Sequence, residues 1–300
     1  MQSIHPYRDA LSAVPVRRDE VEVLGGRTAF WVYGEDDAPH TVLAIHGFRG
    51  EHHGLEPVVA HLPQVRTIMP DLPGFGETDP IPGRRHDLDT YVAWLHAFSD
   101  LVAPGAVVLG HSFGSIVAAA AVADGLETPG LVLINPIGAP ALEGPRGILT
   151  RLAIGYYAAG ARLPRRLGEA LLRNGLVVRI MSEAMAKTRD RGLRAFVHDQ
   201  HRRYFSRFAD RDVLHEAFVT SVSHDVSQPA ARIDRPTLLV AAVQDDITPI
   251  SAVRRLAEVF PRAQLVEIDG VGHLIHYETP VPAARAISRF LDEPAVSGTR

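Results

Sequence analysis

The chain has 300 residues, of which 46% are apolar and 22% are charged, an ordinary composition for a soluble globular protein. Its net charge of −4 argues against nucleic-acid binding driven by charge, and the absence of cysteine excludes disulfides and thiolate chemistry. No stretch approaches the ~20 apolar residues of a membrane span, and the N-terminus lacks a run of signal-peptide type. We therefore expect a cytoplasmic protein without a membrane span.

The predicted strands begin with a hairpin, because apolar runs at 21–24 and 28–33 flank Gly25-Gly26. Later runs are continuously apolar, as in strands buried on both faces of a parallel sheet. They are 42–45, 65–69, 106–109, 131–134, 237–243 and 265–268. Amphipathic helical patterns lie at 87–102, 251–260 and 282–291. This alternation predicts an α/β fold with a mostly parallel central sheet flanked by helices.

The alternation stops between residues 141 and 228. This segment has no strand-like run, and its pattern predicts several helices. We interpret this segment as a helical cap inserted into a core formed by residues 1–140 and 229–300. Residues 141–230 contain 15 Lys and Arg against 9 Asp and Glu, a net charge of +6. Two interpretations of this charge stay open: a solvated helix surface, or a cleft that attracts an anionic substrate. The candidate cleft-facing residues are Arg162, Arg165, Arg166, Arg202, Arg203 and Arg207.

A nucleophile motif follows the predicted strand at 106–109, where residues 110–114 read Gly-His-Ser-Phe-Gly. The G-x-S-x-G pattern between a buried strand and a helix of small residues is typical of a strained turn that exposes a serine hydroxyl. We expect Ser112 to be the nucleophile. The plainer alternative is that Ser112 is only a turn residue.

Acyl transfer at Ser112 would also need two backbone N–H donors for the developing oxyanion. The residue after the nucleophile, Phe113, is one candidate. The other is Phe48, in the sequence His46-Gly47-Phe48-Arg49-Gly50 that follows the predicted strand at 42–45. We take Gly47, Arg49 and His111 as candidate substrate-binding residues.

Taken in order, HGFRG at 46–50, DLPGFGET at 71–78, GHSFG at 110–114, Asp245 and Gly272-His273 resemble the α/β-hydrolase superfamily. The resemblance covers roughly residues 20–292. It implies a triad in the order Ser, acid, His, and it places a cap where the helical insertion falls.

The resemblance also suggests which acid and base act with Ser112. The family often has G-x-x-D-x-x-x-P after the strand at 237–243, and alignment on Pro249 favours Asp245 as the acid, with Asp246 as the alternative. Ala242 stands at the usual glycine position, which is a departure from the pattern. His273 follows the last strand and is the expected base, whereas we expect His276 to be structural.

We expect neither a cofactor nor a metal, because the neighbouring His52 and His53 beside Glu51 have no further ligand cluster at matching spacing. The predicted function is a carboxylesterase-like serine hydrolase that acts on a small-molecule carboxylic ester, or a related acyl compound, through an acyl-enzyme. The alternatives are a C–C bond hydrolase of a diketone and a low-turnover receptor on a hydrolase fold. The sequence defines neither the ester nor the oligomeric state.

Overall fold

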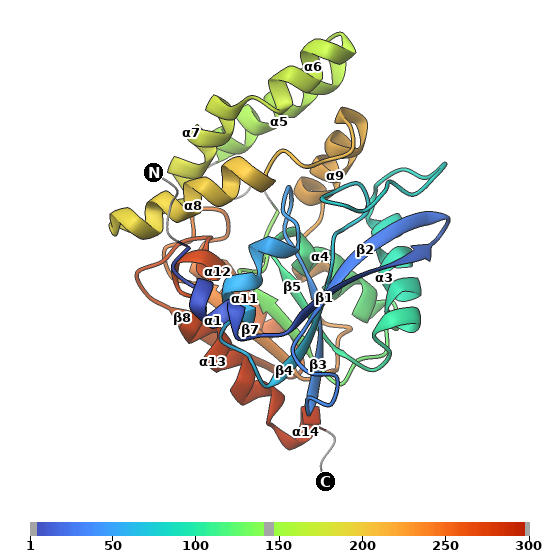
Figure 1. Ribbon diagram of the computed structural model, residues 1–300, viewed down its shortest axis with the longest axis vertical. Helices are drawn as coiled ribbons and strands as arrows, with labels where there is room; N and C mark the ends of the chain where they lie inside the picture. Colours follow the sequence, from blue (N-terminus) through green and yellow to red (C-terminus); the bar gives the residue numbers. More distant parts are fainter. Residues whose placement is uncertain (1–4, 141–146, 298–300) are drawn as a thin grey trace.

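A computed structural model describes residues 5–140 and 147–297. Its centre is an eight-stranded sheet of order β1-β2-β4-β3-β5-β6-β7-β8 (Figure 1). The β1–β2 and β2–β4 pairs are antiparallel, and all the other pairs are parallel. The predicted fold class is confirmed. The strands are β1 (Val16–Val23), β2 (Gly26–Tyr33), β3 (His40–Ile45), β4 (Val65–Pro70), β5 (Val107–His111), β6 (Leu131–Ile134), β7 (Thr237–Ala242) and β8 (Ala263–Ile268).

The first hairpin differs from its prediction in its turn, because Gly26 already belongs to β2, and in the start of its first strand. Its turn is formed by Leu24 and Gly25, which both have positive φ, +51° and +81°, as two-residue hairpin turns require. β1, however, begins at Val16 and not at residue 21. Its first five residues are exposed and mostly charged, so they lack the alternation that marks a half-buried strand.

Apolar side chains cover both faces of the sheet. Helices α3 (Leu88–Val102), α4 (Phe113–Ala123) and α11 (Ile250–Val259) pack on one face. Helices α1 (Arg8–Ser12), α2 (Glu56–Val59), α13 (Pro280–Leu291) and α14 (Pro294–Ser297) lie on the other. Strand residues alternate between the two cores: in β3, Leu43 and Ile45 belong to the first, Val42 and Ala44 to the second. Burial on both faces explains why these strands are continuously apolar in sequence.

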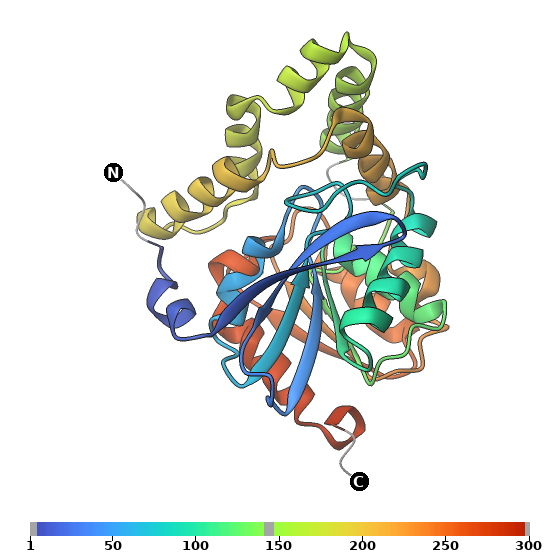
Figure 2. The same ribbon diagram turned by 45° about the vertical axis from the view of Figure 1, so that its right-hand side comes forward.

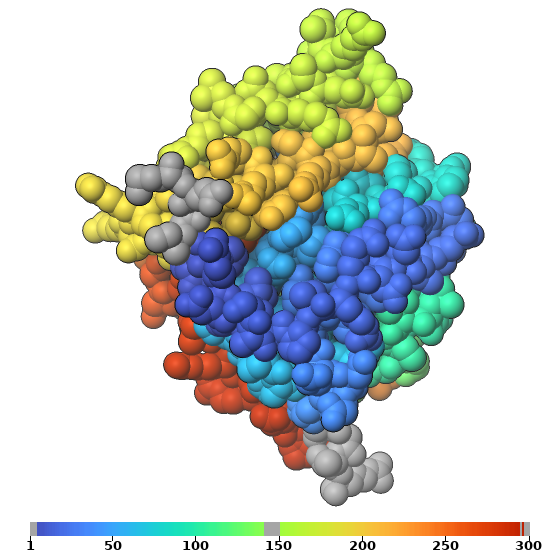
Figure 3. Space-filling model, viewed as in Figure 1, coloured from blue at the N-terminus to red at the C-terminus, as the bar shows by residue number. Residues whose placement is uncertain are grey.

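The described residues between β6 and β7 form a helical insertion. Figures 1 and 2 show α5–α8 together at one end of the molecule, beyond the sheet. Figure 3 shows the surface of these helices in the same view as Figure 1. The helices are α5 (Gly147–Arg162), α6 (Arg165–Leu172), α7 (Gly175–Met185), α8 (Arg191–Tyr204), α9 (Arg211–Ser223) and α10 (Ser227–Ala230). The start expected at residue 141 lies outside the described residues, and α10, which spans the expected end at 228, contacts α4 and α11.

The insertion is joined to the core by backbone hydrogen bonds. The segment after α8 pairs with the loop after β4 through a bridge between Phe75 and Phe208. The N–H of Gly76 donates to the carbonyl of Arg207 at 2.8 Å, and the N–H of Ala209 donates to Gly74 at 2.9 Å. Within the described residues, no helix combines the length and apolar character needed to cross a bilayer.

Candidate active site

Ser112 lies in a strained turn between β5 and α4. Its backbone has φ +53° and ψ −118°, a conformation that costs free energy for a residue with a side chain. The flanking glycines explain how the turn fits. A Cβ on Gly110 would lie 2.4 Å from the carbonyl oxygen of Gly114, and one on Gly114 would lie 2.3 Å from that of Ile45. Strand, turn and helix therefore approach too closely for any other residue at these positions.

Ser112, His273 and Asp245 form a continuous hydrogen-bonded chain. The Ser112 Oγ lies 2.7 Å from His273 Nε2, and His273 Nδ1 lies 2.7 Å from Asp245 Oδ2. His273 and Asp245 are buried, with 6% and 8% of their surface exposed. With Nδ1–H donating to the carboxylate, Nε2 is the atom that can accept the Ser112 proton.

The two acidic residues after β7 have different partners. Asp245 Oδ1 accepts the backbone N–H groups of Ile247 at 2.7 Å and Thr248 at 3.3 Å, which leaves Oδ2 for His273. Asp246 forms an ion pair with the ammonium of Lys187, in the connection between α7 and α8. The carboxylate that contacts His273 is thus Asp245.

Asn135 links the loops that carry Asp245 and His273, a contact that the sequence analysis missed. Its Nδ2 donates to the carbonyl of His273 at 2.7 Å, and its Oδ1 accepts the N–H of Ala242 at 2.9 Å. Asn135 is buried at the end of β6 and has a positive φ of +44°. The Asn-Pro pair at that strand end was the available signal, because asparagine tolerates a left-handed conformation better than most residues.

The loop after β3 brings a second backbone donor near Ser112. A Cβ on Gly47 would lie 3.2 Å from the Ser112 Cβ and 3.1 Å from His111 Nδ1, so the loop passes directly against the turn that carries Ser112. The N–H groups of Phe48 and Phe113 donate to no atom of the described residues. This leaves both available to an oxyanion beside Ser112.

Arg49, next to Phe48, connects this loop to the insertion through side-chain hydrogen bonds. It is 1% exposed and has a positive φ of +58°. Its guanidinium donates to the carbonyls of Phe205 and Leu172, both at 2.8 Å, and to the Tyr157 hydroxyl at 3.3 Å. Neutral acceptors and aromatic rings surround it, and no described carboxylate lies within ion-pair distance.

Buried histidines lie around Ser112 and His273. Burial, and then the neighbouring His273, lower the pKa of His111 to about 3. Burial, and then His111, lower the pKa of His276 well below its ordinary value. The two rings lie 4.1 Å apart, and His111 Nε2 and His276 Nδ1 are buried without a hydrogen-bond partner among the described residues. Both imidazoles are therefore neutral at pH 7.

A cavity of about 220 Å³ opens beside Ser112, between the core loops and the insertion. Gly47, Arg49 and His111, the expected substrate-binding residues, all line it, together with Ser112, His273 and Phe48. Insertion residues from α5, α7, α8 and α9 complete its walls. None of the six arginines considered as cleft-facing lines this cavity.

Glu51, His52 and His53 are the described residues whose side chains come close enough together to be considered as metal ligands. Each Nδ1 already contacts a carboxylate: His52 lies 2.9 Å from Asp71 Oδ1, and His53 lies 2.5 Å from Glu51 Oε1. Asp71 also accepts the backbone N–H of Glu77 at 2.8 Å, so it fixes the turn that follows β4. The arrangement is that of two histidine–carboxylate pairs.

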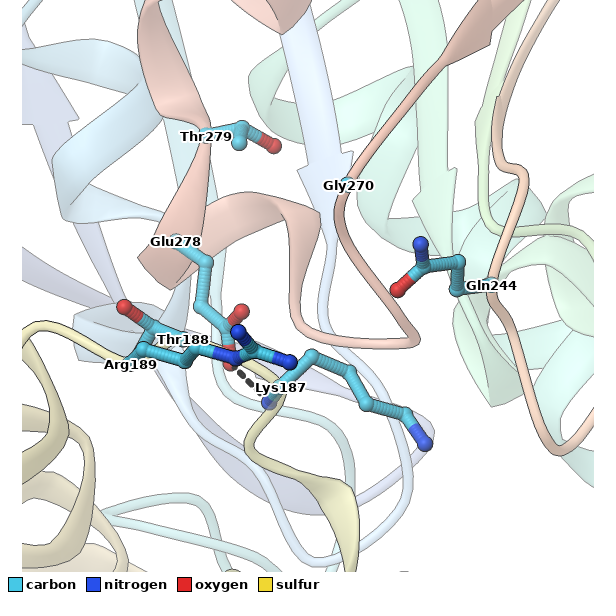
Figure 4. A pocket seen from close by; sticks show the side chains of 7 residues that line it. All are labelled: Lys187, Thr188, Arg189, Gln244, Gly270, Glu278 and Thr279. Atoms are coloured by element: carbon cyan, nitrogen blue, oxygen red, sulfur yellow. Dashed lines mark hydrogen bonds between the residues drawn. The ribbon is translucent and has the colours of Figure 1, made fainter.

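A more open cleft of about 600 Å³ lies between the α7–α8 connection and the loops after β7 and β8 (Figure 4). The backbone N–H of Lys187 donates to Glu278 Oε1 at 2.8 Å there. Ser112, Asp245 and His273 do not line this cleft. It is therefore distinct from the cavity that reaches Ser112.

Comparison with known proteins identifies the family. A family model described as alpha/beta hydrolase fold matches residues 40–280. Lipase 3 of Moraxella sp. (strain TA144) is 24% identical over 276 residues, which cover 87% of this chain and 81% of that protein. A pimeloyl-[acyl-carrier protein] methyl ester esterase of Xanthomonas campestris pv. campestris is 26% identical over 255 residues, 83% of this chain and 94% of that protein. The chain belongs to the alpha/beta hydrolase fold family.

A more local match is to the putative carbamate hydrolase RutD of Pseudomonas syringae pv. syringae. It is 37% identical over 84 residues, which span only 28% of this chain and 32% of that protein. Among solved structures, an esterase from Thermogutta terrifontis has a TM-score of 0.71 at 22% identity, covering 92% of this chain and 98% of that one. An enol-lactonase from Burkholderia xenovorans LB400 has a TM-score of 0.74 at 18% identity, covering 92% and 100%. Both share the fold.

Proposed function

We propose that the chain is a serine hydrolase that cleaves a small-molecule carboxylic ester through an acyl-serine intermediate. The observation that carries the proposal is the chain of two 2.7 Å contacts from Ser112 through His273 to Asp245. The esterase and lipase relatives agree with this reaction class.

In the proposed reaction, His273 Nε2 takes the Ser112 proton as Oγ attacks the ester carbonyl. The N–H groups of Phe48 and Phe113 stabilise the negative charge on the carbonyl oxygen. His273 then gives its proton to the departing alcohol, and Asp245 stabilises the imidazolium while it exists. Water activated by the same histidine hydrolyses the acyl-serine and restores the enzyme.

We further propose that the insertion, residues 141–228, is a cap that encloses the substrate. Its residues supply one side of the cavity that reaches Ser112. Arg49 would couple the cap to the loop that carries the Phe48 N–H, since its guanidinium bonds Phe205, Leu172 and Tyr157.

Turnover of p-nitrophenyl acyl esters tests the proposed function. We expect Ser112→Ala to fold normally and to reduce kcat by ~10⁴–10⁶, because the triad residues act as a unit. A wild-type protein that binds such esters without hydrolysing them would instead be a receptor on a hydrolase fold. Ester turnover that persists in the variant would show that another group is the nucleophile.

A further inference from the structure

The cavity beside Ser112 has two unlike walls. One wall is aromatic: Phe48 contacts Tyr157 and Phe218, whose rings stack with their centroids 4.0 Å apart. The other wall carries polar groups from three segments: Glu51 after β3, Gln200 and Tyr204 on α8, and Tyr277 on α12 (Ile275–Glu278). A ligand that fills the cavity would meet both walls.

Glu51 has one carboxylate oxygen in use and one uncommitted. Its Oε1 lies 2.5 Å from His53 Nδ1 and 3.6 Å from an Arg207 nitrogen. Its Oε2 is buried and has no hydrogen-bond partner among the described residues, while the whole residue is only 1% exposed. A buried carboxylate oxygen without a donor is costly, so a donor supplied by a ligand would be strongly favoured there.

The other polar groups on this wall also have unused hydrogen-bonding capacity. Gln200 and Tyr204 lie one helical turn apart, and thus on the same face of α8. Within the described part of the chain, the Gln200 amide and the hydroxyls of Tyr204 and Tyr277 form no hydrogen bond, although Gln200 and Tyr277 are each only 5% exposed. The Tyr204 ring stacks on His53, with the centroids 4.1 Å apart, which places it beside the Glu51–His53 pair.

We propose that this wall is a polar subsite that binds a hydrogen-bond-donating group, a hydroxyl or an ammonium, on the part of the ester remote from the reacting carbonyl. The proposal rests on the proposed hydrolase function and adds the class of substrate. A carboxylate can only accept hydrogen bonds, so Glu51 selects a donor. It disfavours a substrate whose remote group is itself a carboxylate.

The cations near Glu51 offset part of its charge, but they leave Oε2 as a hydrogen-bond acceptor. His53 Nδ1 lies 2.5 Å and an Arg207 nitrogen 3.6 Å from Oε1, and no donor among the described residues forms a hydrogen bond with Oε2. The Arg207 side chain is also 46% exposed, where water and salt weaken its charge. Arg49, although it lines the same cavity, directs its three described hydrogen bonds to Phe205, Tyr157 and Leu172.

Matched esters provide the test. p-Nitrophenyl esters of equal chain length would end in methyl, hydroxyl, ammonium or carboxylate, over four to eight carbons. A second series would place the same end groups on the alcohol part of a hexanoate ester. In one of these two series, we expect the hydroxyl or ammonium ester to have a kcat/KM roughly 10- to 100-fold above that of the methyl-ended ester. This is the size of effect expected from a hydrogen bond to a charged group. The carboxylate ester should be the poorest substrate. A preference for ammonium that falls with added salt, unlike a preference for hydroxyl, would separate the two donors.

Three variants relate the preference to the subsite. Glu51→Gln removes the charge at nearly constant volume and should reduce the ammonium preference at least about 10-fold. Tyr277→Phe removes only a hydroxyl that has no described partner, so it should fold normally and reduce the preference by a smaller factor. Glu56→Gln is the matched control: Glu56 accepts the Tyr33 hydroxyl at 2.8 Å and does not line the cavity. It should leave the preference unchanged.

The outcomes separate the two proposals. If the wild-type enzyme hydrolyses methyl-ended esters but prefers no donor in either series, the subsite proposal is overturned while the hydrolase proposal stands. A donor preference that survives in both Glu51→Gln and Tyr277→Phe would also overturn it. Failure of the wild-type enzyme to hydrolyse any of the esters would instead count against the proposed function.

Discussion

The turn that carries Ser112 and the helical insertion are built under different steric constraints. At the turn, a single methyl group on Gly110 or Gly114 would come within 2.4 Å of a backbone oxygen. In the insertion, a methyl group on Gly155 would meet no atom within 4 Å. Apolar side chains such as Leu176 and Ile180 are more than 60% exposed there. Steric constraint therefore fixes residue identity throughout the turn. In the insertion it does so only where α5 and α6 meet, where a Cβ on Gly168 would lie 2.1 Å from the carbonyl oxygen of Gly160.

This difference explains which aspects of function the sequence reveals. Each position in the proposed reaction site accepts only one or two amino-acid types. These positions are therefore visible in the sequence as a motif. The proposed substrate selection depends on side chains such as Glu51 and Tyr204, which come from separate segments and line one cavity only in the folded protein. The reaction class is therefore easier to predict than the ester.

Among the variants that test this comparison, the largest effect is expected at Asp245, the proposed acid. Asp245→Asn should reduce kcat by ~10⁴, because an amide favours the wrong imidazole tautomer and cannot stabilise the imidazolium. Asp246→Asn is the matched control, and it should cost less than about threefold because it weakens only the partly exposed pair with Lys187. Steady-state kinetics on one short ester compare the two, and the reverse ranking would assign the acid to Asp246.

Glycine replacements compare the two regions directly. Gly114→Ala should lower the free energy of unfolding by at least about 1–3 kcal/mol, because its Cβ would overlap the backbone oxygen of Ile45. Gly155→Ala, at an exposed position inside α5, should raise it by about 0.5–1 kcal/mol. Urea unfolding monitored by circular dichroism measures both. Equal changes in the two variants would contradict the contrast between the regions.

Acid should destabilise the protein through its buried histidines. His111 and His201 both have a pKa lowered to about 3, mainly by burial, whereas an unfolded histidine titrates near 6.5. Between these values the unfolded chain binds more protons than the folded one, so stability falls as the pH falls from about 6.5 towards 3. The slope should reach about 1.4 kcal/mol per pH unit for each such histidine. Urea midpoints measured from pH 7 to pH 4 test this, and the histidine account fails if they stay constant or rise.

The strands were predictable because burial on both faces leaves continuous apolar runs, and β6 was predicted at residues 131–134, where it lies. The exposed first half of β1 gave no such signal. Contacts between residues far apart in the sequence could not be predicted either. The roles of Asn135, which binds Ala242 and His273, and of Lys187, which binds Asp246, depend on distances that only the fold sets.

The smallest effect is expected on the outside of the insertion. Arg202 and Arg203 both form ion pairs with Asp199, are at least half exposed, and do not line the cavity. Arg202→Gln and Arg203→Gln should therefore change stability by less than about 0.5 kcal/mol and leave the ranking of charged and neutral esters unaltered. A loss of preference for an anionic ester in either variant would show that the basic surface contributes to substrate selection.

The most direct test of the central claim is to find which residue forms the covalent bond. A fluorophosphonate probe, followed by digestion and mass spectrometry, should give one adduct, on the peptide that contains Ser112. Labelling should be lost in Ser112→Ala and strongly slowed in His273→Ala, which lacks the base. An adduct on another residue, or an enzyme that hydrolyses esters yet never labels at Ser112, would contradict the assignment of Ser112 as the nucleophile.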